Sequence, residues 1–369
     1  FGIAYSRGKT VIRASSGIFY DPFQTDMYRR ALLNNGLPQY FQLSRTPAQP
    51  FAPAFPEVFS GIPQGFTPTL QDITTVDPSF ANLYSANANV TISRAITQDI
   101  GLDVTYLYTR GNRIPVFRNI NLVPGGQTLA DGRPVFGSAR VYQGYGNIIS
   151  AESVGQSTYN GLNVTLRKRF AHDFELFGTW TWSHTIDDAP EQNNIDAGAF
   201  LLSDPTNRSR DRGDSLVDRR HVFNANFIYS PTYRSGQGLA GYLLNNNRLS
   251  IFSTLQSGEA FNIGSNRILN GDASTPATFQ RPLFVGRNTL RAPRWFEMNA
   301  RYTRVFPIRE RISAEFIAES TNIFNRTNVT GLNSTATVDV AGAIQTPAPA
   351  TWTAAADQRL IQVGFRLSF

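Results

Sequence analysis

The chain alternates apolar and polar residues over many short segments, and stretches with a helical period are scarce. The last segment is the clearest, with one side formed by Ile361, Val363, Phe365, Leu367 and Phe369. A period of two places successive side chains on opposite faces of a β-strand. The same alternation recurs in segments 88–93, 100–108, 162–167, 174–183, 223–229, 296–303 and 312–319. The pattern predicts an all-β protein.

The polar side of these segments separates two kinds of sheet. The solvated side of a soluble β-sandwich carries many Lys and Glu residues, whereas Asn, Thr, Ser, Gly and single charges predominate here. This mixture is typical of a water-filled membrane barrel whose apolar side faces lipid. Aromatic residues near predicted strand ends fit the girdles at membrane interfaces. They are Tyr106, Tyr108, Phe170, Trp180, Trp182, Phe306 and Phe369. The predicted fold class is therefore an antiparallel transmembrane β-barrel.

Connection lengths alternate along the chain. We predict eleven strands, at residues 1–6, 9–20, 85–97, 99–110, 157–169, 173–186, 219–230, 247–262, 292–305, 309–323 and 357–369. The long loops are 21–84, 111–156, 187–218, 263–291 and 324–356. Short turns join the remaining strands, except that the intermediate connection 231–246 takes a short-turn position. Bacterial outer-membrane barrels have short periplasmic turns and long extracellular loops, whereas a soluble sandwich has no reason to sort its loops in this way.

This alternation predicts an orientation and a strand count. With the long loops outside the cell, the first and last strands run toward the periplasm, where we expect the C-terminus. Single-chain bacterial barrels have even strand numbers, and an open edge leaves backbone groups unpaired in lipid. The eleven strands are therefore expected to be part of a larger barrel, with preceding strands missing from this chain.

The composition is compatible with a β-barrel, although the length and mean hydropathy alone would suggest soluble domains. A length of 369 residues and a mean hydropathy of −0.25 would fit two or three soluble domains. A barrel explains the same values, because only every second strand residue meets lipid and long loops dilute the average. Cysteine is absent, which excludes disulfides, thiolate zinc sites and a cysteine nucleophile. The sequence has no run of about 18 apolar residues that would predict a membrane-spanning helix.

Charge and proline content bear on partners. The formal net charge is +7, but the basic residues are scattered, which indicates solvation rather than a nucleic-acid partner. The loop 21–84 holds nine of the 21 prolines, including Pro47, Pro50, Pro53 and Pro56. Pro-rich segments can act as polyproline II ligands for other domains, but the favoured interpretation is a long surface excursion held without β-ladders. Such a loop can still contribute to ligand capture.

Candidate catalytic chemistry is sparse. In the stretch 183–188, the adjacent Ser183 and His184 point to opposite faces of a strand and cannot form a nucleophile–base pair. Together with His221 this stretch lacks the ligand spacing of a metal site, and no Gly-punctuated acidic loop follows the acidic pair 187–188. We predict a protein that is not an enzyme, with no catalytic, cofactor-binding or metal-binding residues.

Mixed charges gather in the loop 187–218 and directly after it. They are Arg208, Arg210, Asp211, Arg212, Asp214, Asp218, Arg219 and Arg220. Such a cluster can bind an anionic ligand or the phosphates of lipopolysaccharide. The favoured interpretation is a lattice of salt bridges at the barrel rim.

The C-terminal strand carries a more specific signal. Alternation is unbroken from Ile361 to the final Phe369. A last strand that ends in Phe resembles the sorting signal of bacterial outer-membrane barrels, which the barrel-assembly machinery binds by strand addition. We therefore predict that Val363, Phe365, Leu367 and Phe369 form the assembly signal.

An ordered set of stretches carries a family resemblance. The set is 1–5, 8–13, 17–22, 157–170, 179–189, 218–223, 256–261 and 322–325, and it includes Thr-Trp-Thr-Trp-Ser-His at 179–184. Each stretch is weak alone, but together they span nearly the whole chain and resemble the barrel of Oar-like TonB-dependent outer-membrane receptors.

The resemblance implies that residues 1–369 are the C-terminal half of a 22-stranded barrel, without its N-terminal plug and first strands. It implies location in the bacterial outer membrane and no cofactor. The implied partners are membrane lipid, lipopolysaccharide, the barrel-assembly machinery, TonB through the missing plug only, and an extracellular ligand of unknown identity. The complete protein would take up a scarce ligand with energy from the TonB system.

Two other functions stay open at this point. One is an outer-membrane protein for adhesion or surface structure, which uses its long extracellular loops. The other is a soluble β-sandwich that binds glycans.

Overall fold

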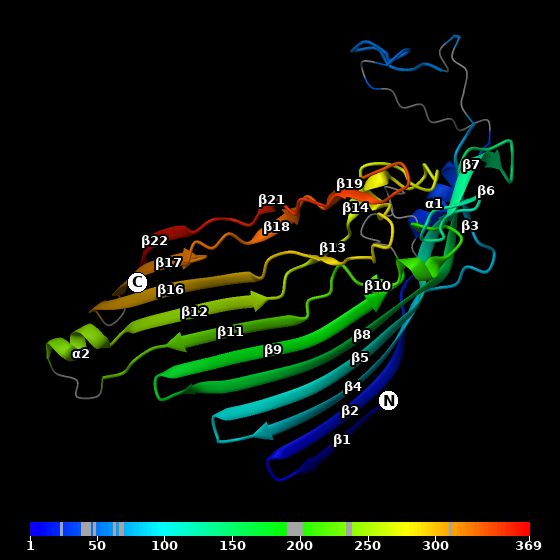
Figure 1. Cartoon of the computed structure of the whole chain (residues 1–369). Coiled ribbons are helices and arrows are strands. Elements are labelled where there is room, and N and C mark those ends of the chain that lie inside the picture. Colours follow the sequence, from blue (N-terminus) through cyan, green and yellow to red (C-terminus); the bar gives the residue numbers. More distant parts are fainter. Residues whose placement is uncertain are drawn as a thin grey trace.

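One large antiparallel sheet dominates the computed structural model, which describes residues 1–22, 25–37, 46, 49–61, 64–65, 70–189, 202–233, 238–309 and 312–369. Eleven strands follow one another in chain order, each antiparallel to the next (Figure 1). They are β1 (Gly2–Arg7), β2 (Thr10–Tyr20), β4 (Tyr84–Ala95), β5 (Ile100–Asn119), β8 (Ile148–Ala171), β9 (Phe174–Asp187), β11 (His221–Tyr229), β12 (Asn247–Gln256), β16 (Trp295–Arg309), β17 (Ile312–Thr321) and β22 (Leu360–Ser368). The predicted number and order of strands are confirmed.

The register keeps one face of this sheet apolar, and we call it the apolar face. Directly opposed residues share a face, because side chains alternate with a period of two. One row runs through Ile12, Ile92, Val104, Val164 and Trp180 across five consecutive strands. The soluble-sandwich interpretation is wrong, because the consecutive strands extend one sheet instead of dividing between two.

The opposite face, called the polar face below, carries ladders of amide and hydroxyl groups. The Asn163 amide donates to the hydroxyls of Thr179 and Thr181, both at 2.9 Å. The hydroxyls of Thr91 and Thr105 lie 2.9 Å apart on neighbouring strands. Because these groups bond across strands, the polar face satisfies much of its own hydrogen-bonding capacity.

The two ends of the sheet differ. At the short-turn end, β8 and β9 meet in a tight turn in which His172 and Asp173 have φ values of 55° and 69°. Positive φ at both central residues matches the right-handed twist of a hairpin. The connection from β11 to β12 lies at the same end and contains the helix α2 (Leu239–Leu244), as Figure 1 shows.

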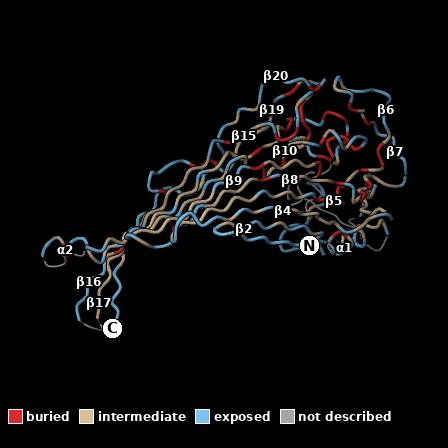
Figure 2. Tube along the Cα trace, turned by 90° about the horizontal axis from the view of Figure 1, so that it is seen from below, coloured by how far each residue is buried: buried red, intermediate tan, exposed pale blue. Residues whose placement is uncertain are grey.

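The long-loop end carries the smaller elements. They are α1 (Thr25–Leu33), β3 (Ile73–Val76), β6 (Leu122–Thr128), β7 (Pro134–Arg140), η2 (Arg208–Asp211), β10 (Gly213–Asp214), β13 (Ala260–Phe261), β14 (Gly264–Ser265), η3 (Ala277–Phe279), β15 (Leu290–Arg291), β18 (Val329–Leu332), β19 (Thr335–Val338), β20 (Ile344–Thr346) and β21 (Trp352–Ala355). Figure 2 shows that the buried residues concentrate at this end. The loops therefore form a packed structure.

Three predicted boundaries were wrong at the long-loop end. The strands predicted to end at 110 and to begin at 157 continue to Asn119 and from Ile148. A β-bulge at Arg113, with φ of 59°, and Pro115 interrupt the alternation without ending the ladder. The strand predicted over 247–262 stops at Gln256, and residues 260–261 pair with 290–291 in a separate small sheet. Only glycine fits at position 258 between them, because a Cβ there would lie 1.7 Å from the Ala292 carbonyl oxygen.

The loop 21–84 was predicted to lack β-ladders, and this was also wrong. Its strand β3 pairs in parallel with the start of β8, beginning with Ile73 opposite Ile148. The Asp72 carboxylate fixes this register by accepting from the Asn147 backbone N–H and side-chain amide at 2.6 and 3.0 Å. Pro47 lies outside the described residues.

In the part of the chain that the structure describes, neither α1 nor α2 is long and apolar enough to cross a membrane.

Candidate functional site at the long-loop end

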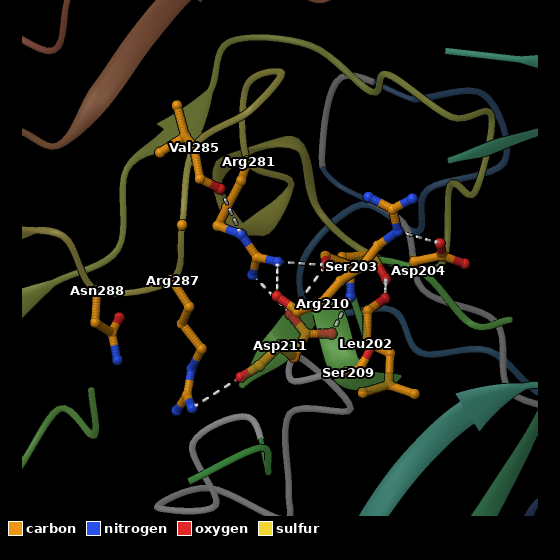
Figure 3. A network of polar contacts seen from close by, with 12 residues as sticks. Leu202, Ser203, Asp204, Ser209, Arg210, Asp211, Arg281, Val285, Arg287 and Asn288 are labelled. Carbon is orange, nitrogen blue, oxygen red and sulfur yellow. Dashed lines mark hydrogen bonds and ion pairs between the residues drawn. The ribbon is translucent and has the colours of Figure 1, made fainter. Parts of the chain in front are cut away.

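A buried ion pair joins two loops that are far apart in the sequence. Asp211, at the end of η2, is 3% exposed, and Arg281, after η3, is 6% exposed. The Arg281 Nη1 donates to Asp211 Oδ1 at 2.6 Å (Figure 3). Ser203 completes the group, because its hydroxyl donates to Asp211 at 2.9 Å and accepts from Arg281 Nη2 at 2.9 Å. A buried charge needs such partners.

Arg287 ties the same two loops to the end of β9. Its guanidinium pairs with the Asp187 carboxylate and donates at 3.2 Å to the carbonyls of Asp211 and Ala189. The Asn288 amide adds a bond of 2.7 Å to the Asp214 carbonyl. These side chains supply the hydrogen-bond partners that irregular buried backbone needs.

A third loop joins this network through Arg210. Its Nη2 donates at 2.8 Å to the carbonyl of Asp131, between β6 and β7. Its Nε lies 3.0 Å from the carboxylate of Asp204, which is 1% exposed. Two of the five long loops are thus joined by one ionic network, defined here as Asp187, Asp204, Arg210, Asp211, Arg281 and Arg287. The third loop is attached to it through the Asp131 carbonyl.

A second ionic cluster lies where β11 begins. The buried Asp218 accepts from the Thr185 N–H at 2.8 Å and pairs with Arg291 at 2.9 Å. Asp214 lies 2.9 Å from the His184 Nε2 and also pairs with Arg291. Burial raises the pKa of Asp214, but the His184 hydrogen bond and the Arg291 charge outweigh it, so the pKa is lowered from 3.8.

A polar cleft of about 220 Å³ opens between the loop segment 77–81 and the bulged parts of β5 and β8. Its walls include Asp77, Arg113, Arg118 and Glu152. Arg118 and Glu152 form an ion pair of 2.5 Å, and hydrogen bonds from Ser79 hold the pKa of Asp77 below its usual value. The Arg113 guanidinium is exposed and lies over the Tyr84 ring at 5.4 Å. The cleft can thus offer a guanidinium to a small polar ligand.

Ser183 and His184 serve separate structural contacts. Ser183 lies opposite Gly161 on the polar face, and its hydroxyl donates to the Arg219 carbonyl at 3.0 Å. His184 lies on the other face, beside Asp214. Among the described residues, no group of three or more His, Asp or Glu side chains is placed to hold a metal ion.

The predicted assembly residues share the apolar face of β22. Val363, Phe365 and Leu367 oppose Ala318, Phe316 and Ala314 of β17 and are 62%, 80% and 62% exposed. Phe369 follows the end of the strand and is 96% exposed. β22 is the last strand of the sheet path.

The short turns, the separate apolar and polar faces and the packed loops are features of an outer-membrane barrel, and a comparison with known sequence families gives the same result. The model of the family described as outer membrane beta barrel domain matches residues 1–286. The chain belongs to this outer-membrane β-barrel family. The apolar face is therefore the lipid-facing side of a barrel wall, and the polar face lines the lumen. The predicted outer-membrane location is confirmed.

Solved structures of outer-membrane proteins share the fold of this barrel domain. The outer-membrane transporter YddB from Escherichia coli matches with a TM-score of 0.53 and 10% identity, over 98% of this chain and 39% of that one. A mutant of the ferric enterobactin receptor PfeA from Pseudomonas aeruginosa matches with a TM-score of 0.50 and 13% identity, over 100% and 39%. The chain thus spans about two fifths of their length. No curated protein sequence matches it.

Within this barrel domain, the mixed charges predicted from the loop 187–218 form the predicted lattice. Arg212 is the exception, because it is exposed and its guanidinium makes no hydrogen bond or ion pair with the described residues. The opposite charges come from Arg281, Arg287 and Arg291, which no motif in the sequence singled out. The available signal was loop charge: 187–218 has eight acidic residues against three arginines, whereas 263–291 has four arginines against one Asp.

Proposed function

We propose that this chain is the C-terminal half of the barrel wall of a TonB-dependent receptor, and that the complete protein takes up a scarce ligand with TonB-derived energy. The observation that carries the proposal is the eleven-stranded wall, in which tight turns at one end oppose packed, ionically joined loops at the other. Large, structured loops are more consistent with the capture of a specific ligand than with a pore for unselective diffusion.

The size of the chain supports a larger barrel. It spans 39% of each of the two solved outer-membrane proteins, one a transporter and one a receptor for a ferric ligand. An odd count of eleven strands also fits part of an even-stranded barrel. The remaining strands and the plug would lie in the rest of the complete protein.

In the proposed orientation, the long loops are extracellular and the short turns are periplasmic. β22 runs from the last long loop toward the short-turn end, so the C-terminus would lie in the periplasm. The exposed Phe365 and Phe369 would then be available to the assembly machinery from that side.

The assembly signal has a direct test in the complete protein. Phe369→Ala should lower the amount of folded barrel in the outer membrane, measured as the heat-modifiable band on a gel. Phe324→Ala, which removes another exposed Phe (63%) outside β22, is the matched control. Equal amounts of folded barrel for both variants would contradict the assignment of Phe369 to the assembly signal.

The uptake function is tested in the source bacterium with two gene deletions. One removes the complete receptor and the other removes TonB, and each strain grows on ferric siderophores, oligosaccharides or peptides as the limiting nutrient. Loss of growth on the same nutrient in both strains is expected. A nutrient lost with the receptor but retained without TonB would contradict energy coupling. Loss of surface attachment without any nutrient phenotype would instead indicate an adhesion protein.

The proposed ligand surface includes the cleft beside the loop segment 77–81. Arg113→Ala should weaken uptake of the ligand, because it removes the exposed guanidinium without breaking an ion pair. Arg212→Ala, an exposed guanidinium outside this cleft, should leave uptake unchanged.

A further inference from the structure

The helix α2 presents apolar side chains to solvent at the short-turn end. Its exposed fractions are 73% for Leu239, 64% for Tyr242, 49% for Leu243 and 47% for Leu244. The segment 238–247 contains no charged residue. Four neighbouring large apolar side chains on so short a helix form a patch that favours a nonpolar environment.

The helix is fastened to the lipid-facing side of the wall. Arg304 follows Tyr302 by two residues on β16, and the register places both on the apolar face. The Arg304 guanidinium donates to the carbonyls of Tyr242 and Leu243 at 2.8 and 3.3 Å. It also lies 5.1 Å from the centroids of the Tyr242 and Phe306 rings.

A second lipid-facing side chain completes this attachment. Asn247, opposite Arg304, donates to the Leu243 carbonyl at 2.6 Å and accepts from the Tyr302 hydroxyl at 2.5 Å. The last carbonyls of a helix lack partners within it. Arg304 and Asn247 supply these partners, so the end of α2 does not depend on water.

We propose that α2 is an interfacial anchor that inserts Leu239, Tyr242 and Leu243 into the phospholipid leaflet at the short-turn end of the barrel. The occupant is lipid, because the patch is continuous with the established lipid-facing side through Tyr302 and Phe306. Interfacial helices lie with their apolar side buried about 5–10 Å into the headgroup and acyl boundary. Tyr and Arg are suited to this depth, because their polar ends reach the headgroups.

The anchor is independent of ligand uptake and needs only the outer-membrane barrel. It accounts for the one connection at the short-turn end that exceeds a tight turn. A two-residue turn would close the β-hairpin of β11 and β12, so the additional residues are available for another contact.

The test measures the depth of a fluorescent label in the complete protein. Leu239→Cys carries an environment-sensitive dye, and the protein is reconstituted into vesicles of phosphatidylethanolamine and phosphatidylglycerol. Lipids brominated near the headgroup should quench the dye several-fold more than aqueous iodide does. Val340→Cys, at an 87% exposed loop position, is the aqueous control, and Val90→Cys, on the apolar face of β4, is the lipid control.

Two results would overturn the anchor. Iodide quenching of the Leu239 label equal to that at Val340 would place α2 in water. Protection from both quenchers would mean that protein covers it. The attachment is tested separately with Arg304→Ala, which should reduce lipid quenching, against Arg301→Ala on the polar face of the same strand. Equal quenching in these two variants would remove the role assigned to Arg304.

Discussion

The two ends of this barrel wall satisfy the hydrogen bonds of their backbone groups in different ways. At the short-turn end, backbone groups pair within tight turns, and single charged side chains add donors to a few carbonyls there. Lys168 is an example, because its Nζ donates to the carbonyls of Ala171 and Phe174 at 2.5 and 2.9 Å. At the long-loop end, irregular backbone is buried and depends on charged and amide side chains. Gln280, for instance, is fully buried and bonds three backbone groups.

This difference separates the stability of the loops from that of the wall. The wall rests on continuous ladders between neighbouring strands, whereas the loops rest on a few long-range side-chain pairs. Loss of one such pair should open loops without unfolding strands. The following variants test this separation, from the largest expected effect to the smallest.

Asp211→Ala should have the largest effect, and it should be confined to the long-loop end. Arg281 would keep a buried charge without its carboxylate, a loss of about 3–5 kcal/mol. Hydrogen exchange of the complete protein in detergent should show faster exchange in 202–218 and 277–291, with β8 and β9 unchanged.

Two further variants sharpen this result. Arg212→Ala removes an exposed guanidinium from the adjacent position and should not alter exchange. The double variant Asp211→Ala/Arg281→Met should recover part of the loss, because no unpaired charge remains. Faster exchange throughout the strands of Asp211→Ala would mean that loops and wall unfold together.

Lys168→Met tests the short-turn end. The substitution keeps the apolar stem but removes the ammonium, which donates to the turn carbonyls and lies 3.7 Å from the centroid of the Phe174 ring. We expect a loss of about 1–3 kcal/mol in the free energy of unfolding, measured by urea titration of the complete protein in detergent. Lys9→Met, the other lysine of the chain and also at a short turn, is the control. Equal effects of the two variants would contradict a specific role for Lys168.

Asn163→Ala tests the polar face between the two ends. Its amide spans Thr179 and Thr181 on the next strand, and water in the lumen can replace it. The same titration should show a loss of about 0.5–1.5 kcal/mol. A loss as large as that of Lys168→Met would mean that this part of the lumen excludes water.

The acid response of the Asp214 cluster should be the smallest effect, because this carboxylate is partly solvated. Its pKa is lowered in the folded protein, so its contribution is complete above the ordinary value of 3.8 and is lost as pH falls through the lowered value. Limited proteolysis of the loop at 202–218 by an acid-active protease should accelerate over that range. Asp214→Asn, which mimics the protonated carboxyl, should show the faster cleavage already at the upper end of this range and should lose the pH dependence. The same acid acceleration in Asp214→Asn would assign the response to another group.

The wall could be predicted from the sequence because its rules are local. Alternation in segments such as 162–167 assigns a face to each residue, and tight turns fix which strands are neighbours. Bulges escape this reasoning, because the extra residue at Arg113 inverts the pattern without breaking the ladder.

The loop network could be predicted only in part. The acidic excess of 187–218 required a basic partner, but sequence spacing does not show that Arg281 and Arg287 would supply it. Long-range pairs depend on how the loops fold over one another. The parallel pairing of β3 with β8 escaped prediction for the same reason, since β3 lies in a proline-rich loop two strands away along the sheet path.

The length of β8 determines how far above the bilayer surface the proposed ligand cleft lies. Its 24 residues are about 14 more than the roughly 10 that a tilted strand needs to cross the apolar band. At about 3.3 Å per residue and a tilt of about 40°, the surplus rises about 35 Å above the bilayer. In the proposed orientation, the cleft beside Arg113 would stand well clear of the lipid surface, so a ligand would be captured before it reached the membrane.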